Sequence, residues 1–186
     1  MIEWLLSISQ TAYFIWKRED FMIVIAGSPR KGMYSDRIAE RFARLTGSKI
    51  IYARNLHIGP CRACGYCKGI GNGTCVQKDD MPSVLESVRT SDGIALISPV
   101  YWWQVTAQIK LVIDRLYALR DGELRGKKLA VIMNGEAEES DAEYRILSEQ
   151  FSEMAEYLGM KYSFLGCGTP EGDEAAFAAA LEKMDG

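Results

Sequence analysis

Five short apolar segments recur along the chain, and a segment with apolar residues at helical spacing follows each one. The apolar segments are rich in β-branched residues and do not alternate with polar ones, a pattern typical of strands buried on both faces. The expected strands are 21–26, 49–53, 93–98, 128–133 and 161–165. The expected helices are one from Ser35 to Gly47, one starting at Asp80 and Pro82, 105–119, 140–158, and a closing helix marked by Phe177, Leu181 and Met184.

Residues with known capping preferences mark several of these helix ends. Ser35 is the expected N-cap of the first helix, and Gly47 is expected to end it. Ser140 with Glu143 has the spacing of a capping box, and Gly159 is expected to end that helix.

The strand–helix alternation predicts an α/β fold, a doubly wound five-stranded parallel sheet with helices on both faces. In such sheets ligands bind beyond the carboxyl ends of the strands, at the switch point of the strand order. The loops after the first, third and fourth strands, 28–35, 99–104 and 134–139, are therefore expected to line one cleft.

The loop after the first strand has the composition of an anion site. Gly27-Ser28-Pro29-Arg30-Lys31-Gly32 is a tight basic turn that leads into a helix N-terminus, where unpaired N–H groups and the helix dipole favour a phosphate. Ser28, Arg30 and Ser35 add side-chain donors. An ordinary turn with a solvated Arg-Lys pair is the alternative. Neither a mononucleotide P-loop nor a dinucleotide fingerprint matches these residues.

Three large aromatic residues occupy the loop after the third strand, in the run Pro99-Val100-Tyr101-Trp102-Trp103-Gln104. A flat aromatic cofactor would explain them, because its rings need apolar cover. Burial against a subunit partner or over the core is the alternative. A phosphate at the first loop and a planar ring at the third together indicate flavin mononucleotide (FMN).

Composition narrows the class of protein further. The 186 residues are 48% hydrophobic and carry a net charge of −3 with a pI of about 5.3, which fits one globular domain and gives no field suited to nucleic acid or anionic membrane. The five cysteines and the lack of a recognisable secretory signal favour a reducing, cytoplasmic location. Residues 1–20 are expected to be either an amphipathic helical extension or a start assigned too early, with Met22 as the true first residue, before a single domain over 21–186.

Four of the cysteines lie in the long loop 55–80, at the spacing C-x2-C-x2-C-x7-C. They are Cys61, Cys64, Cys67 and Cys75. This spacing is nearer to that of iron–sulfur clusters than to the two separated pairs of zinc sites, and metal-free or oxidised thiols are the third interpretation. His57 is expected to be a bystander, and Cys167 a buried packing residue after the last strand.

Three motifs resemble those of the flavodoxin-like NAD(P)H-dependent FMN reductases, and especially the iron–sulfur flavoproteins among them. They are GSPRKG at 27–32, CRACGYC with Cys75 and KDDM at 78–81, and SPVYW…VTAQIKLVIDR at 98–115. The chain departs from the usual pattern at Tyr34, where the family often has asparagine, and at 134–136, which is less glycine-rich.

The resemblance implies a flavodoxin-like sheet, bound FMN and homodimers or homotetramers. It implies that Ser28, Arg30, Gly32 and Ser35 hold the FMN phosphate, and that the ring system lies along the third loop and beside the fourth. The residues implied for the ring are Pro99, Val100, Tyr101, Trp102, Trp103, Asn134, Gly135 and Glu136. It also implies that Cys61, Cys64, Cys67 and Cys75 are the ligands of a [4Fe–4S] cluster.

The expected function is therefore an FMN-dependent oxidoreductase that moves electrons from a donor such as NAD(P)H to an acceptor, through FMN and a [4Fe–4S] cluster. A ferredoxin or another one-electron carrier is the expected partner, and the chemistry belongs to the cofactor rather than to a catalytic side chain. The alternatives are a metal-free NAD(P)H-dependent FMN or quinone reductase, a non-enzymatic electron carrier of flavodoxin type, and a zinc-stabilised interaction module.

Overall fold

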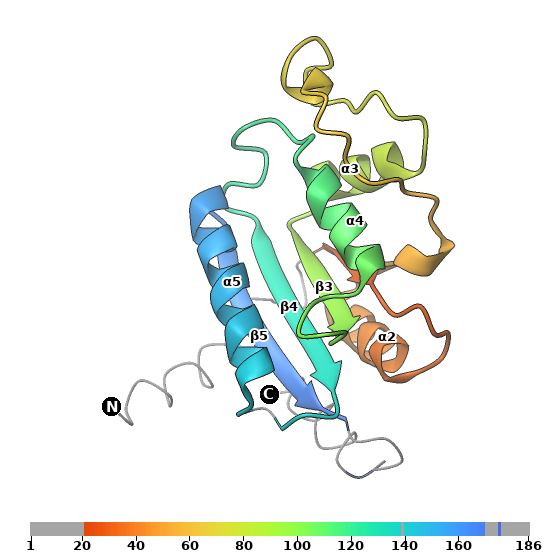
Figure 1. The fold of residues 1–186 in the computed structure, drawn as a ribbon, viewed down its shortest axis with the longest axis vertical. Helices are drawn as coiled ribbons and strands as arrows, with labels where there is room; N and C mark the ends of the chain where they lie inside the picture. The colour runs from red at the N-terminus through yellow and green to blue at the C-terminus, as the bar shows by residue number, and fades with distance from the viewer. Residues whose placement is uncertain (1–20, 139, 170–174, 176–186) are drawn as a thin grey trace.

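A computed structural model of the chain describes residues 21–138, 140–169 and 175, and within them five parallel strands form one sheet in the order β2-β1-β3-β4-β5. The strands are β1 (Met22–Ala26), β2 (Lys49–Tyr52), β3 (Gly93–Pro99), β4 (Lys128–Gly135) and β5 (Lys161–Gly168). The helices are α2 (Tyr34–Thr46), α3 (Met81–Thr90), α4 (Ala107–Leu116) and α5 (Ala142–Leu158), with 3-10 turns η2 (Ala53–Asn55) and η3 (Tyr66–Lys68). The predicted fold class is confirmed (Figure 1).

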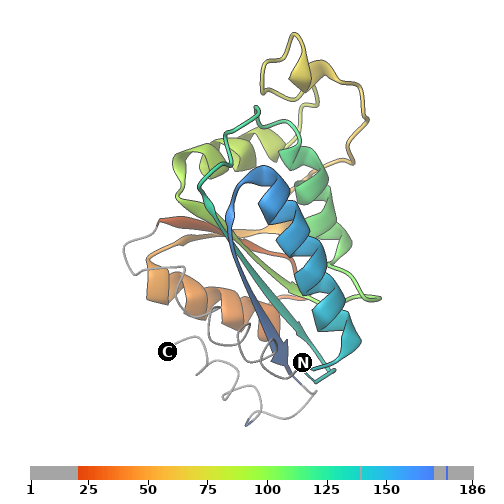
Figure 2. The ribbon, with the colours of Figure 1, turned by 90° about the vertical axis from the view of Figure 1, so that its left-hand side faces the viewer.

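The sheet is covered on both faces, so its central strands are buried throughout. Figure 2 shows α2 on one side of the sheet and α4 and α5 on the other. Along β1, Ile23 and Ile25 pack with α3, α4 and α5, whereas Met22, Val24 and Ala26 pack with α2. This division explains why the strand sequences show no polar alternation.

Three strands extend further than the hydrophobic pattern predicts. Pairing continues from Pro99 to Asn134 between β3 and β4, and from Gly135 to Gly168 between β4 and β5. Asn134 and Gly135 are therefore the last residues of a strand, not part of the loop predicted at 134–139. Cys167 lies inside β5 rather than after it, and it is buried as expected.

Two predicted helix caps are wrong by one or two residues. The N-cap of α2 is Met33, not Ser35, and the N-cap of α5 is Asp141, so Ser140 and Glu143 do not form a capping box. The C-terminal ends are as predicted, because Gly47 and Gly159 both adopt the left-handed conformation that closes a helix. Residues 1–20 and the closing helix expected around 177–184 lie outside the described residues.

The two ends of the sheet carry different features. In Figure 1 the arrowheads of β3, β4 and β5 point to the lower part of the view, where the loops after β1, β3 and β4 lie. The loop that contains the cysteines, drawn in orange to yellow, reaches the top of both views, beyond the C-terminal end of α4. Helix α4 thus runs from the carboxyl edge of the sheet to the cysteine loop. Among the described residues no helix is long and apolar enough to cross a bilayer.

Candidate functional site

Gly27 closes β1 where the chain passes against α4. A Cβ at this position would overlap the side chain of Ile109 and lie 3.1 Å from Thr106 Oγ1. The carbonyl of Gly27 accepts a hydrogen bond of 2.7 Å from the Thr106 hydroxyl. Glycine is therefore required here for close packing, and the loop after β1 starts from a fixed point.

The loop after β1 holds its shape through its own polar groups. The hydroxyl of Ser28 donates to the carbonyl of Arg30 and accepts from the N–H of Arg30, at 3.0 and 3.2 Å. Gly32 has a φ of 74°, which a side chain would strain, and a Cβ there would meet nothing within 4 Å. The turn is thus preformed and open in front of Gly32, with the side chain of Arg30 exposed.

An ion pair between Asp36 and Arg54, which the sequence did not predict, holds this loop in place. The buried carboxylate of Asp36, in the first turn of α2, accepts the N–H of Gly32 at 2.7 Å and pairs with Arg54 at 2.7 Å. Arg54 also donates to the carbonyl of Ser28 and lies over the ring of Tyr52. The only signal in the sequence was an acidic residue at the start of the helix, where the dipole favours it.

The first, third and fourth loops meet, as predicted. The hydroxyl of Ser35 donates to Asn134 Oδ1 at 2.7 Å, which joins the start of α2 to the end of β4. The N–H of Val100 donates to the carbonyl of Asn134 at 2.8 Å. Asn134 is buried, and its amide lies 3.4 Å from the hydroxyl of Thr169 at the end of β5. Ser35, Val100 and Asn134 are therefore joined by hydrogen bonds at the carboxyl edge of the sheet.

The aromatic loop after β3 is a tight two-residue turn. The main-chain groups of Tyr101 and Gln104 exchange two hydrogen bonds, and Trp102 and Trp103 occupy the central positions with φ values of 54° and 60°. Positive φ at both positions is what a type I′ turn requires, and asparagine or glycine usually supplies it. Two tryptophans in this conformation are strained, and strain of this kind gathers at functional sites.

These tryptophans are also unusually open to solvent. Trp102 is 90% exposed and Trp103 is 55% exposed, and the two rings meet edge to face with centroids 6.2 Å apart. Pro99, just before the turn, is buried at the end of β3, and Tyr101 is exposed. The turn therefore presents aromatic faces at the carboxyl edge of the sheet without burying them in the core.

The end of β4 and Glu136 lie close to the start of α5. Glu136 is exposed, and a Cβ at Gly135 would lie 3.4 Å from Glu143 Oε1. Burial raises the pKa of the Glu143 carboxyl above its ordinary value, and the charge of Asp141 raises it further.

The types of side chain and backbone group found here suit the two parts of an FMN molecule, its phosphate and its ring system. The preformed turn with a helix N-terminus suits a phosphate, and the open aromatic turn suits a flat ring system. A separate cavity of about 310 Å³ beside this turn is lined by Lys31, Gly32, Asp36, Glu40, Tyr52, Arg54 and Asn55.

The cysteine loop is ordered by its own backbone and by contacts with the domain. Gly69 and Gly71 donate to the carbonyl of Tyr66, and Gly73 donates to the carbonyl of Cys67. Cys67 and Cys75 are partly buried and pack against the core, whereas Cys61 and Cys64 are exposed. His57 is exposed, and its Nδ1 lies 3.8 Å from Asp80 Oδ2.

The four thiols match a metal centre in donor type but not in arrangement. All are free, and Cys75 Sγ lies 3.3 Å from the guanidinium of Arg115. Within the described part of the chain, however, no three His, Cys, Asp or Glu side chains are placed to hold a metal ion. The predicted ligands therefore share one loop without forming a coordination sphere in this conformation.

The parallel strand order 2-1-3-4-5 defines the class of protein as flavodoxin-like. Solved structures agree on the fold. The chain is similar to an NAD(P)H:quinone oxidoreductase from Methanothermobacter marburgensis, with a TM-score of 0.70 and 17% identity over 90% of this chain and 94% of that one. It is also similar to an FMN-dependent NADH-azoreductase from Bacillus anthracis, with a TM-score of 0.66 and 13% identity over 89% and 98% of the chains.

Residues 22–162 match the family described as NADPH-dependent FMN reductase, and the chain belongs to that family. An iron-sulfur flavoprotein from Methanosarcina thermophila is 38% identical over 101 residues, which are 52% of this chain and 52% of that protein. One from Archaeoglobus fulgidus is 32% identical over 133 residues, 68% of this chain and 65% of that protein. The chain thus aligns with about half to two thirds of the length of these curated relatives.

Proposed function

We propose that the protein is an FMN-dependent oxidoreductase. The observation that carries the proposal is that Asn134, at the end of β4, bonds both Ser35 in the first turn of α2 and Val100 just after β3. A phosphate-type turn and exposed aromatic rings at the switch point of a flavodoxin-like sheet suit one ligand, a flavin nucleotide. Membership of the FMN reductase family supports the same cofactor.

In this proposal the chain's own residues bind and orient the cofactor. Ser28, Arg30, Gly32 and Ser35 hold its phosphate, with Asp36 and Arg54 keeping the turn in shape. Pro99, Val100, Tyr101, Trp102 and Trp103 lie along the rings, and Asn134, Gly135 and Glu136 border the other side. FMN supplies the redox chemistry, taking two electrons from a donor such as NAD(P)H and passing them on.

We also propose that Cys61, Cys64, Cys67 and Cys75 hold a [4Fe–4S] cluster. The spacing of the cysteines and the names of the iron-sulfur flavoprotein relatives support it. Because Cys61 and Cys64 are exposed and apart from a common centre in this conformation, binding requires their segment to move. A homodimer or homotetramer in the cytoplasm, with a one-electron carrier such as a ferredoxin as partner, completes the proposal.

A metal-free NAD(P)H-dependent flavin or quinone reductase is the second candidate. It is favoured by the lack of a three-ligand metal group among the described residues. In this reading the cysteine loop keeps its shape through hydrogen bonds and ion pairs alone.

Anaerobic preparation with a visible spectrum and iron and sulfide analysis distinguishes the two. One FMN with about four iron and four sulfide per chain supports the cluster, and one FMN without iron supports the metal-free reductase. Protein that neither carries nor takes up FMN would refute both. The paired variant Arg30→Ala with Ser35→Ala should lose FMN, and Arg145→Ala, on the exposed face of α5, should keep it.

A further inference from the structure

Arg115 lies in the last turn of α4 and is one of the most buried polar side chains described, with 2% of its surface exposed. Its guanidinium makes a two-bond contact with the carboxylate of Asp79. Nη1 lies 2.7 Å from Oδ2, and Nη2 lies 3.0 Å from Oδ1. This fork geometry is the strongest arrangement of an arginine and a carboxylate.

The same pair joins the two ends of the cysteine loop, Gly59 and Asp79, which together form its neck. Nη1 of Arg115 donates to the carbonyl of Gly59 at 2.9 Å, and the N–H of Gly59 donates to Asp79 at 3.1 Å. Gly59 precedes the first cysteine and Asp79 follows the last. The segment between them is therefore closed at its base by one buried guanidinium.

The contact also reaches one of the thiols. Nη2 of Arg115 lies 3.3 Å from Cys75 Sγ, within hydrogen-bond distance for sulfur. Cys75 is thus held by the residue that closes the neck. Cys61 and Cys64, on the other side of the loop, are exposed.

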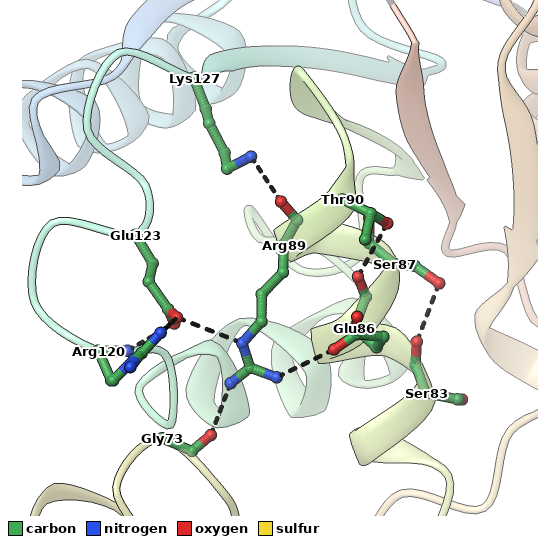
Figure 3. Close-up of polar contacts among 9 residues, drawn as sticks. All are labelled: Gly73, Ser83, Glu86, Ser87, Arg89, Thr90, Arg120, Glu123 and Lys127. Atoms are coloured by element: carbon green, nitrogen blue, oxygen red, sulfur yellow. Dashed lines mark hydrogen bonds and ion pairs between the residues drawn. The ribbon is translucent and has the colours of Figure 1, made fainter.

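Two further cations hold the tip of the loop, but both contacts are more exposed. Arg89 on α3 donates to the carbonyl of Gly73 at 2.7 Å and pairs with Glu123, as Figure 3 shows. Lys68 reaches Asp121 at 2.7 Å, and the side chain of Asp121 is 97% exposed. Solvent weakens such pairs, whereas the neck pair is shielded from it.

We propose that Arg115 is a positioning residue that closes the loop of residues 59–79 and fixes Cys75 against the core without a metal. The loop then has one fixed thiol at its neck and an exposed segment with Cys61 and Cys64. This inference concerns the loop itself and stands whether or not the cysteines hold a cluster.

The test is the alkylation rate of each cysteine in full-length protein that is loaded with FMN, reduced and treated with a chelator. After quenching and unfolding, trypsin separates the sites, because Cys61 falls in peptide 55–62, Cys64 and Cys67 in 63–68, and Cys75 in 69–78. The variants are Arg115→Met, Asp79→Asn and Arg115→Lys. Arg145→Met is the control, since Arg145 is exposed on α5 and pairs with Glu149 on the same helix.

We expect Arg115→Met and Asp79→Asn to raise the labelling rate of Cys75 about tenfold while Cys61 stays within about twofold of wild type, as local opening of the neck predicts. Arg115→Lys keeps the charge but cannot span Gly59, Asp79 and Cys75 together, so Cys75 should again react faster, by a smaller factor. The control should match wild type.

Unchanged labelling of Cys75 in Arg115→Met and Asp79→Asn would overturn the proposal. So would full protection in Arg115→Lys, because charge alone would then suffice. Equal acceleration at the buried Cys167 of β5 would also overturn it, since Arg115 would then support the whole sheet. If the wild type proves free of iron, the cluster proposal fails and these rates still decide the role of Arg115.

Discussion

The hydroxyl of Thr106 donates a hydrogen bond of 2.7 Å to the carbonyl of Gly27, and the same oxygen accepts the N–H of Ile109 at 3.4 Å. Thr106 is thus both the N-cap of α4 and the tie that holds the end of β1. The side chain of Thr106 therefore fixes the position of Gly27, where the turn after β1 begins, relative to α4.

Replacing Thr106 with valine should lower the free energy of unfolding by about 1–3 kcal/mol, because it removes a buried hydrogen bond and a helix cap while keeping the shape. Urea unfolding followed by circular dichroism measures the change. Thr106→Ser retains the hydroxyl and should lose less than half as much. A valine variant as stable as wild type would show that the tie is weak.

The close packing of Gly27 on Ile109 predicts a size limit at that position. Gly27→Ala should cost about 1–3 kcal/mol through overpacking, and it should weaken FMN binding by displacing the turn. Unfolding and flavin fluorescence titration measure the two effects. Adding Ile109→Ala, which makes room, should recover FMN affinity in the double variant relative to Gly27→Ala. A double variant that binds no better would place the fault elsewhere in the turn.

The turn at 101–104 should become more stable when its tryptophans are replaced by the residues that its backbone favours. Trp102→Asn with Trp103→Gly relieves two strained conformations and should raise the free energy of unfolding by about 1–3 kcal/mol. FMN retention should fall, because the aromatic faces are gone. Trp102→Phe, which keeps a ring in the strained position, should show no gain in stability. Loss of stability in the Asn-Gly variant would mean that the rings stabilise more than the strain costs.

The ion pair at Asp79 predicts a defined dependence of stability on pH. Burial raises the pKa of Asp79, but hydrogen bonds from Arg115, Gly59 and Met81 outweigh it and hold the pKa below the ordinary 3.8. A lowered pKa stabilises the folded state fully above the unfolded value, and this contribution is lost as the pH falls through the folded value.

Asp79→Asn should therefore cost about 3 kcal/mol at pH 7, by leaving Arg115 buried without its counter-charge. The difference between wild type and variant should be constant from pH 7 to pH 5 and shrink below about pH 4. Urea midpoints at pH 7, 5, 4 and 3.5 measure it. A difference that widens on acidification would contradict the sign.

The sheet and the approach of the segments at its carboxyl edge could be predicted from the sequence because both follow from local patterns. Apolar runs such as 93–98 mark strands, and parallel strands bring their carboxyl ends together whatever the details of their loops. The meeting of Ser35, Val100 and Asn134 was therefore predictable, and the structure confirms it.

The side-chain partners could not be predicted, because they depend on contacts between distant positions. The hydroxyl of Ser35 donates to Asn134, 99 positions away, and α2 begins one residue before Ser35, so the local capping rule predicted neither its partner nor its position. Arg115 is 36 residues from Asp79 and 56 from Gly59, and nothing in its own helix indicates either. Asp36 and Arg54 were missed for the same reason.

Helix α4 connects the carboxyl edge of the sheet to the cysteine loop, and its length fixes the distance between them. Thr106 holds the end of β1 and Arg115, nine positions later, closes the cysteine loop, a spacing of about 14 Å and two and a half turns. Deleting a single residue between them would rotate one of these side chains about 100° around the helix axis relative to the other. The helix could then keep the contact of Thr106 with Gly27 or that of Arg115 with Gly59, but not both. Natural variation in chain length is therefore expected to be absent from this helix and to accumulate in the surface connection at 120–126.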